Sequence, residues 1–224
     1  MNRAQYIDFG LKEYREAWQE QERYHNELVE AKKNKTETVH KLIFNEHPHV
    51  FTLGKSGQQN NLLINDEFLK KINASYYQSN RGGDITYHGP GQIVGYPIFD
   101  LEILKLGVKE YIHMLETAIV RTLAGYNIAA SPLEGATGVW LDINTPNARK
   151  ICAIGVRVSK AITMHGFALN VNTDLKYFSY INPCGFIDKG VTSMEKELGV
   201  KPEFEEVKQK LKNHLIDLFK LNLI

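Results

Sequence analysis

GVWL at residues 138–141, KICAIGVRV at 150–158 and ITMHGFALNV at 162–171 follow one another closely along the chain. Each stretch has the length and the apolar, β-branched or aromatic content that is typical of a strand. Strands therefore come in a group here, and do not alternate one by one with helices. Such grouping favours an α+β fold, in which helices lie against a mixed, largely antiparallel sheet.

The rest of the chain extends this pattern on both sides. Apolar residues recur at helical spacing in three segments, and short apolar runs bounded by turn residues predict further strands. No internal repeat, low-complexity linker or break in composition divides the sequence, so we expect a single domain over residues 1–224. The expected helices are residues 10–33, 108–123 and 203–219, and the additional expected strands are residues 39–44, 50–53, 74–79 and 93–99.

The bulk composition excludes several classes of protein. Of 224 residues, 43% are hydrophobic and 24% charged, which is ordinary for a globular domain. The formal net charge of +1 provides no overall field that would attract nucleic acid. No run of 18 apolar residues predicts a membrane span, and the first residues resemble neither a signal nor a transit peptide. We therefore expect a cytoplasmic protein that binds neither nucleic acid nor membrane.

Cys184 lies between a proline and a glycine, in the run Asn182-Pro183-Cys184-Gly185. Proline fixes its own φ angle and glycine permits conformations that a Cβ forbids, so this run predicts a turn with a thiol at its tip. A thiol becomes a good nucleophile when it ionises, and a neighbouring ammonium favours the thiolate. Lys150 is the candidate ammonium. The hypothesis is that Cys184 is a covalent nucleophile and that Lys150 activates it.

Cys152 is the alternative nucleophile. Side chains alternate along a strand, so Lys150 and Cys152 are expected on the same face. A cysteine in the middle of a strand, however, has no free backbone N–H groups with which to stabilise an oxyanion. The simpler interpretation is that Cys152 is a small buried apolar residue. In a reducing compartment the two cysteines are not expected to form a disulfide, and without CxxC spacing they make a poor zinc site.

A glycine-rich run, RGGDITYHGPGQ, occupies residues 81–92. Four glycines and a proline exclude a helix, and such a loop exposes backbone N–H groups that can hold a carbonyl, phosphate or carboxylate. The run has neither the Gly-Lys-Ser/Thr ending of a P-loop nor a following helix of the dinucleotide-binding kind. The alternative is an ordinary surface turn.

Histidines offer a second set of candidates. His40, His47 and His49 are close in sequence, but no cysteine or acidic cluster completes a metal site around them, so we favour structural roles. His165 lies in an expected strand, where it is either a core residue or part of a pocket wall.

Four motifs in order resemble one known family. They are RGGxxTYHGPGQ at residues 81–92, KICAIG at 150–155, HGFALN at 165–170 and NPCG at 182–185, preceded by HPHVFTLG at 47–54. The chain resembles the octanoyl-acyl carrier protein:protein octanoyltransferases, also called lipoate-protein biosynthesis protein B, over residues 10 to 200. One such motif alone would be weak, whereas several in the right order and spacing are specific.

The resemblance implies a fold related to the catalytic module of biotin and lipoate protein ligases, and residues 1–224 as one acyltransferase domain. It implies transfer of an octanoyl group from octanoyl-acyl carrier protein to a lysine of a lipoyl domain through a cysteine thioester, with no cofactor and no metal. Acceptors would be the lipoyl domains of 2-oxoacid dehydrogenases and the glycine cleavage H protein. The family's nucleophile and activating lysine match Cys184 and Lys150. Its substrate contacts match Arg81, Gly82, Gly83, Asp84, Ile85, Thr86, Tyr87, His88, Ala153, Ile154, Gly155, Gly166, Phe167 and Ala168.

Two other functions remain open from the sequence. An ATP-dependent lipoate or biotin protein ligase would use a related fold, although Cys184 has no task in adenylate chemistry. A non-catalytic module that binds an acyl group or a metal would use the glycine-rich run or the early histidines. For the acyltransferase, we expect the small residues Gly155, Gly166 and Ala168 to leave room for the acyl chain.

Overall fold

The structure is a computed structural model that describes residues 2–182 and 190–224. Its larger sheet has nine strands among these residues, in the order β12-β1-β2-β6-β10-β9-β8-β7, with β11 beside β9. Strand β1 is parallel to β2 and β12, and β11 is parallel to β9, while the other neighbours are antiparallel. These strands are β1 (Asn2–Leu11), β2 (His40–Glu46), β6 (Gln92–Ile98), β7 (Ser131–Leu133), β8 (Ala136–Leu141), β9 (Arg149–Ser159), β10 (Ile162–Asn170), β11 (Gly190–Val191) and β12 (Leu221–Leu223).

A smaller sheet has the order β4-β3-β5, from β3 (Val50–Leu53), β4 (Ser75–Gln78) and β5 (Ile85–His88). The long helices are α1 (Tyr14–Asn34), α4 (Val108–Ala124) and α6 (Phe204–Phe219). Shorter helical segments are α2 (Asp66–Lys71), α3 (Leu101–Leu104) and α5 (Met194–Leu198), with the 3-10 turns η1 (Gln59–Asn61) and η2 (Leu175–Tyr180).

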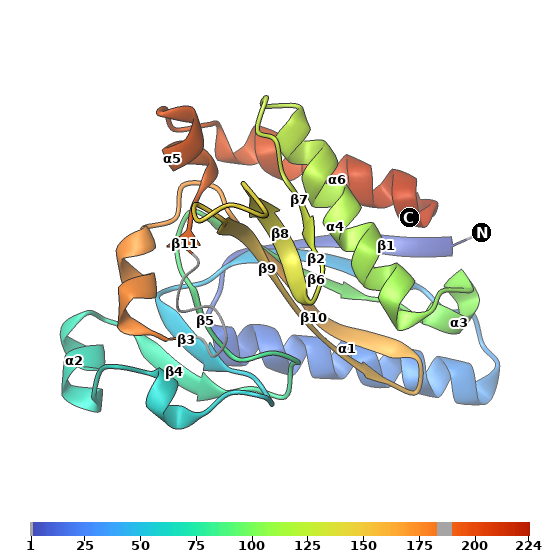
Figure 1. Cartoon of the computed structure of the whole chain (residues 1–224). Coiled ribbons are helices and arrows are strands. Elements are labelled where there is room, and N and C mark those ends of the chain that lie inside the picture. The colour runs from blue at the N-terminus through green and yellow to red at the C-terminus, as the bar shows by residue number, and fades with distance from the viewer. Residues whose placement is uncertain (1, 183–189) are drawn as a thin grey trace.

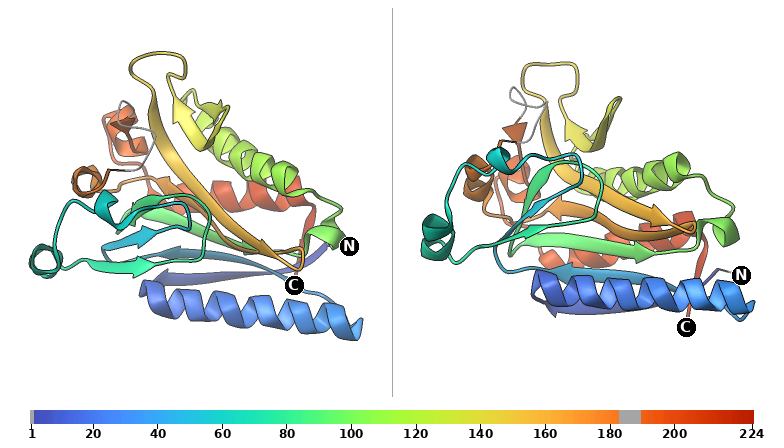
Figure 2. Two further views of the ribbon diagram at one scale, coloured as in Figure 1. Left: turned by 60° about the horizontal axis from the view of Figure 1, so that its bottom comes forward. Right: turned by 90° about the horizontal axis from the view of Figure 1, so that it is seen from below.

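Helices cover both faces of the larger sheet. In Figures 1 and 2, α1 runs along one face while α4 and α6 lie side by side over the other. Successive residues of β2 divide between these faces, because strand side chains alternate. Leu42 and Phe44 pack in the core under α4 and α6, whereas Ile43 packs against Ala17 and Leu28 of α1. The sheet is therefore buried on both sides, which explains why its central strands are almost continuously apolar.

The smaller sheet forms a third core with α2 and η2. Phe51 of β3, Ile85 and Tyr87 of β5, and Leu69 of α2 are all buried there. This unit lies beside the end of the larger sheet, on the left in Figure 1. The glycine-rich loop between β4 and β5 contacts the larger sheet directly, since the backbone N–H of Gly82 donates to the carbonyl of Val156 in β9 at 2.9 Å.

The expected fold class is confirmed, and each expected helix and strand is present within a few residues of its expected bounds. The helix expected at residues 10–33 is in fact α1, which begins at Tyr14. Residues 2–11 form β1, a strand that the sequence analysis did not predict. Its side chains are mostly half-exposed, so β1 has only a weak alternating pattern, and its strand conformation depends on pairing with β2 and β12.

Candidate functional site

A cavity of about 780 Å³ lies where the smaller sheet and its loops meet β9 and β10. Its wall comes from the loop before β5, from the paired strands β9 and β10, from the turn between β7 and β8, and from η2 and β11. Segments that are distant in sequence therefore meet at one hollow, which makes it the leading candidate for a ligand site.

Most of the residues assigned through the family resemblance line this cavity. They are Lys150, Arg81, Gly82, Gly83, Asp84, Ile85, Thr86, His88, Ala153, Ile154, Gly155, Gly166, Phe167 and Ala168. Tyr87 is different: it is fully buried in the third core, where its ring stacks on Tyr177 at 4.8 Å between centroids. Cys184 lies in the segment 183–189, outside the described residues. Asn182 and Gly190, the described residues on either side of that segment, both line the cavity.

Lys150 reaches the cavity from the start of β9. Its Nζ lies over the ring of Trp140 on the neighbouring strand β8, 4.5 Å from the ring centroid. A cation at that distance from an indole is attracted by the ring quadrupole. Gly138 of β8 also lies close, since a Cβ there would come within 3.5 Å of the Lys150 Cε. The Lys150 side chain therefore packs against strand β8 at Trp140 and Gly138.

Cys152 is a core residue and a poor nucleophile. Its side chain is 0% exposed and packs in the core under α4 and α6. Burial raises the pKa of its thiol far above the ordinary value, because the thiolate would be desolvated. A bulge in the β8–β9 pairing separates it from Lys150, since Val139 pairs with Cys152 but the next residue, Trp140, pairs with Lys150. Only Lys150 of the two lines the cavity.

A set of buried polar residues, which we call the polar wall, consists of Thr52, Arg81, His88, Gln92 and Asn170. The Arg81 Nε and Nη2 donate to the Thr52 Oγ1, at 3.2 and 2.9 Å, and that hydroxyl donates to the His88 Nε2 at 3.4 Å. The His88 Nδ1 donates to the Gln92 Oε1 at 2.8 Å, and the Gln92 Nε2 donates to the Asn170 Oδ1 at 2.8 Å. In this order, each residue of the polar wall from Arg81 to Gln92 thus donates a hydrogen bond to the next member, and the series ends at Asn170. Chains of hydrogen bonds in a buried site polarise and strengthen one another.

The polar wall continues to the strand that carries Lys150. The Asn170 Nδ2 donates to the carbonyl of Thr192 at 3.0 Å, and the N–H of Thr192 donates to the carbonyl of Lys150 at 2.9 Å. Residues from the glycine-rich run, from β10 and from the chain after β11 thus form one connected hydrogen-bond network.

His88 is held neutral in this arrangement. Burial lowers its pKa well below the ordinary value, and the nearby His47 and Arg81 lower it further. The hydrogen bonds of the ring are those of a neutral imidazole, because one ring nitrogen donates to Gln92 and the other accepts from Thr52. Desolvation likewise lowers the pKa of His165, on the same cavity, to about 3. His165 is therefore both buried and part of the cavity wall.

Arg81 brings a positive charge to the cavity wall. Its side chain is 8% exposed, and its hydrogen-bond partners among the described residues are neutral oxygens of Thr52 and Gly82. The Asp84 carboxylate acts on Arg81 at longer range while bonding to Asn61 and to the N–H of Ile85. A buried guanidinium with neutral partners suits a carbonyl or an anionic group of a ligand.

The remainder of the lining is largely apolar and can hold a hydrocarbon chain. Ile112, Trp140, Ile154, Phe167, Phe178 and Ile181 contribute to it. The expectation that Gly155 and Gly166 leave space for the chain is wrong. A Cβ on Gly155 would lie 2.8 Å from the carbonyl oxygen of Gly82, and one on Gly166 would lie 2.2 Å from that of Gly95. These glycines permit close backbone approach, of the glycine-rich loop and of β6 respectively.

The early histidines do not converge on one point. The His47 Nε2 accepts from the Tyr96 hydroxyl at 2.6 Å, His49 stacks on Tyr177 at 4.1 Å between centroids, and His40 packs on Phe99. Over residues 2–182 and 190–224, the structure contains no group of three side chains suited to holding a metal ion.

Several cavity residues were not singled out by the sequence analysis. Gln92 and Asn170 belong to the quoted motifs, but nothing in the motifs indicated that they bond to each other. Tyr14 of α1, Trp140 of β8 and Lys196 of α5 also line the cavity, and they carry no local signal that distinguishes them from ordinary core or surface residues.

None of the helices in the described part of the chain could cross a bilayer.

Residues 13–216 match the sequence model of a protein family, the lipoyl protein ligase A/B catalytic domain. The chain belongs to this family. Within the lipoyl protein ligase A/B family, a protein named octanoyltransferase from Bacteroides thetaiotaomicron is 58% identical over 93% of this chain and 92% of its own length. An octanoyltransferase from Parabacteroides distasonis is 54% identical over 98% of this chain and 100% of its own. The resemblance drawn from the sequence motifs is thereby confirmed.

Solved structures support the ligase-like fold. A bipartite lipoate protein ligase from Thermoplasma acidophilum has a TM-score of 0.71 at 15% identity, covering 100% of this chain and 86% of that one. Biotin protein ligase from Aquifex aeolicus, solved with biotin and ATP, has a TM-score of 0.55 at 12% identity, covering 98% and 71% of the two chains. At these identities the likeness concerns the fold.

Proposed function

We propose that this chain transfers an octanoyl group from octanoyl-acyl carrier protein to a lysine of a lipoyl domain, through a thioester on Cys184 that Lys150 activates. One observation carries the proposal. The amine-bearing residue Lys150 lines the same partly apolar cavity as Asn182 and Gly190, which flank the segment containing Cys184. An amine, a thiol-bearing segment and room for an alkyl chain are the parts that acyl transfer requires.

The enzyme class rests on the relatives. With 58% and 54% identity to octanoyltransferases over nearly the whole chain, the protein is an octanoyltransferase, an acyltransferase of lipoate biosynthesis. Family membership implies lipoyl-domain proteins as acceptors. We propose in addition that octanoyl-acyl carrier protein is the donor and that 2-oxoacid dehydrogenases and the glycine cleavage H protein provide the acceptors. Residues 1–224 would then form one catalytic domain.

Acylation of the enzyme is the first step. The Cys184 thiolate attacks the carbonyl carbon of the donor thioester, a C–S bond forms to Cys184, and the C–S bond to the pantetheine arm breaks. The departing thiolate takes a proton from the Lys150 ammonium. One thioester replaces another, so the step is close to isoenergetic and needs no ATP.

Transfer to the acceptor completes the cycle. The neutral amine of the acceptor lysine attacks the acyl-cysteine, a C–N bond forms, and Cys184 leaves as a thiolate. Lys150, now neutral, takes the proton that the amine loses, which restores the starting enzyme. Formation of an amide from a thioester makes this second step favourable.

The cavity accounts for binding of the acyl chain. Each buried methylene contributes roughly 0.8 kcal/mol, so the seven carbons beyond the carbonyl contribute roughly 5 kcal/mol. The apolar lining from Ile112, Ile154 and Phe167 provides a surface for that chain. Arg81, at the polar wall, is placed in the same cavity to hold a carbonyl or the polar pantetheine arm.

Intact-mass spectrometry tests the proposal. Incubated with octanoyl-acyl carrier protein and no acceptor, the enzyme should gain one octanoyl group in a hydroxylamine-sensitive bond. Cys184→Ser should abolish this thioester, and Cys152→Ser, the matched control, should retain it. Lys150→Ala should slow acylation by about 10²–10⁴-fold, the usual loss when a general acid–base group is removed. An adduct that depends on Cys152, or product formed from octanoate and ATP without the carrier thioester, would refute the assignment.

A further inference from the structure

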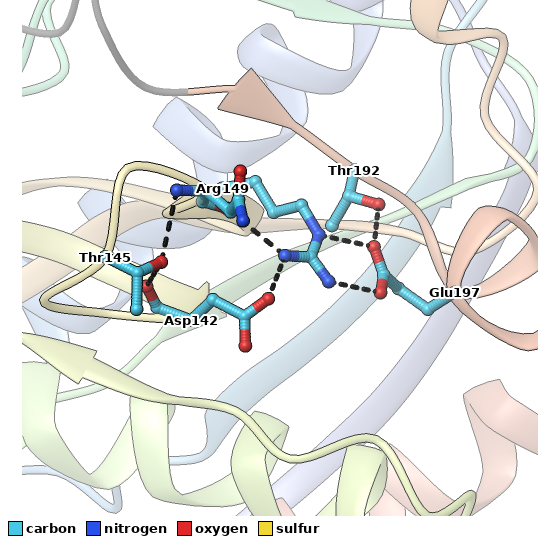
Figure 3. A network of polar contacts seen from close by, with 6 residues as sticks. Asp142, Thr145, Arg149, Thr192 and Glu197 are labelled. Carbon is cyan, nitrogen blue, oxygen red and sulfur yellow. Dashed lines mark hydrogen bonds and ion pairs between the residues drawn. The ribbon is translucent and has the colours of Figure 1, made fainter.

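An ion-pair network joins the strand of Lys150 to the chain that follows the Cys184 segment (Figure 3). Arg149, which precedes Lys150, donates from Nε to the Glu197 Oε1 at 2.7 Å and from Nη2 to the Glu197 Oε2 at 2.6 Å. Its Nη1 bonds to Asp142 and to the carbonyl of Asn147. Two parallel bonds between a guanidinium and a carboxylate fix both the distance and the relative orientation of the two groups.

The Arg149–Glu197 pair is partly shielded from water. Their side chains are 23% and 15% exposed, whereas Asp142 on the other side of Arg149 is 54% exposed. The hydroxyl of Thr192 donates a further bond to the Glu197 Oε1. Glu197 therefore receives three hydrogen bonds, and the bonds from Arg149 are the main cause that lowers the pKa of its carboxyl.

Glu197 is held in place by a short, well-capped helix. The Ser193 side chain accepts from the N–H of Lys196 at the start of α5, and Gly199 ends the helix with a φ of 71°. Met194 of α5 is fully buried in the core under α4 and α6. The carboxylate that accepts the hydrogen bonds from Arg149 thus belongs to a helix that packs into the core under α4 and α6.

The pair acts across a strand contact that is weak by itself. Strand β11 has two residues, and it pairs with β9 so that Gly190 faces Arg149 and Val191 faces Lys150. Backbone bonds at its two ends run from the N–H of Gly190 to the carbonyl of Ala148 and from the N–H of Thr192 to that of Lys150. So short a pairing does little to fix the two segments relative to each other, and the Arg149–Glu197 pair adds two directional side-chain bonds across the same contact.

We infer that Arg149 and Glu197 are positioning residues for acyl transfer: they fix β11 and Thr192 against β9 and so set where the Lys150 amine stands relative to the chain leaving the 183–189 segment. The inference rests on the proposed function, in which Lys150 exchanges protons at Cys184. Neither Arg149 nor Glu197 is among the residues that line the cavity. Their effect is on geometry, and a displacement of about 1 Å at a reacting group can cost about 100-fold in rate.

Two substitutions and one control test this inference. Glu197→Gln keeps the shape of the side chain but replaces one acceptor oxygen with an N–H₂ group that opposes the guanidinium. Arg149→Lys keeps the charge but loses the paired geometry. The control is Glu20→Gln, which breaks the pair between Glu20 and Arg23 on the exposed side of α1. The readouts are the maximal rate of enzyme acylation, the half-saturating concentration of octanoyl-acyl carrier protein, and the rate at which iodoacetamide alkylates the Cys184 peptide.

Both test variants should lower the maximal acylation rate by about 10–100-fold, with less than about a threefold change in half-saturation. Alkylation of Cys184 should slow as well, and Glu20→Gln should match the wild type in all three readouts. Unchanged maximal rates, or rates that fall only as the folded fraction falls, overturn the inference and leave the proposed function intact. A wild-type enzyme that forms no thioester on Cys184 overturns both, so the two failures are distinguishable.

Discussion

The polar wall and the Arg149–Glu197 pair both connect to the strand of Lys150, but they are built from different interactions. The polar wall is buried, contains a neutral histidine, and is connected by hydrogen bonds of defined direction. The Arg149–Glu197 pair is ionic and partly exposed. Removing one member of a buried network costs much stability, because the hydrogen-bonding groups of its partners are left unsatisfied. A partly exposed ion pair contributes little stability, so its value lies in geometry.

Breaking the polar wall should have the largest effect on stability. Gln92→Met removes the partner of the His88 Nδ1 and of the Asn170 Oδ1, both buried. We expect a loss of about 3 kcal/mol in the free energy of unfolding, measured by urea denaturation. Gln209→Met is the matched control, since Gln209 is exposed on α6 and bonds only to Asn213 among the described residues. Equal stability of the two variants would show that the polar wall contributes nothing.

Acid should weaken the fold through its buried histidines before it affects Glu197. Burial lowers the pKa of His40 and of His47 to about 4, below the unfolded value of 6.5. The contribution of each neutral histidine to the free energy of unfolding is therefore fully present above pH 6.5 and is lost as the pH falls towards 4. The loss is about 2 kcal/mol per histidine at pH 5. The pKa of Glu197 is lowered from 4.5, so its contribution persists until the pH falls below that value.

The unfolding free energy, measured between pH 7 and pH 5, checks this order. His40→Asn keeps an acceptor for the N–H of Asp100, to which the His40 Nδ1 bonds, and should flatten the pH dependence. Glu197→Gln should leave the slope in this range unchanged. A slope that is unaltered in His40→Asn would contradict the assignment of the acid sensitivity to this histidine.

The smallest effect concerns salt. Glu197→Gln should cost about 1 kcal/mol of stability at low ionic strength, and most of that cost should vanish in about 1 M sodium chloride, which screens partly exposed charges. The cost of Gln92→Met should be the same in both conditions, because the polar wall is buried. If salt reduces both costs equally, the contrast between the two regions does not hold.

Much of the fold followed from local patterns. Helical periodicity placed α4 and α6, and runs such as KICAIGVRV placed β9, because burial on one face leaves a repeating signal in sequence. The family motifs indicated Lys150, Arg81 and His88, all of which line the cavity. Strand β1 was not predicted, because its half-exposed side chains leave little alternation in the sequence and its conformation depends on neighbouring strands.

The sequence by itself determined the family, the fold class and most of the helices and strands, and it predicted the residues that we propose carry the chemistry. Only the tertiary structure decided which of them meet. It joined Arg81 to Thr52, 29 residues away, and Arg149 to Glu197, 48 residues away, and it filled the space beside Gly155 with the carbonyl of Gly82. Local patterns record whether a side chain is buried, but not which distant group it contacts, because that pairing is set by how the sheets, loops and helices pack together.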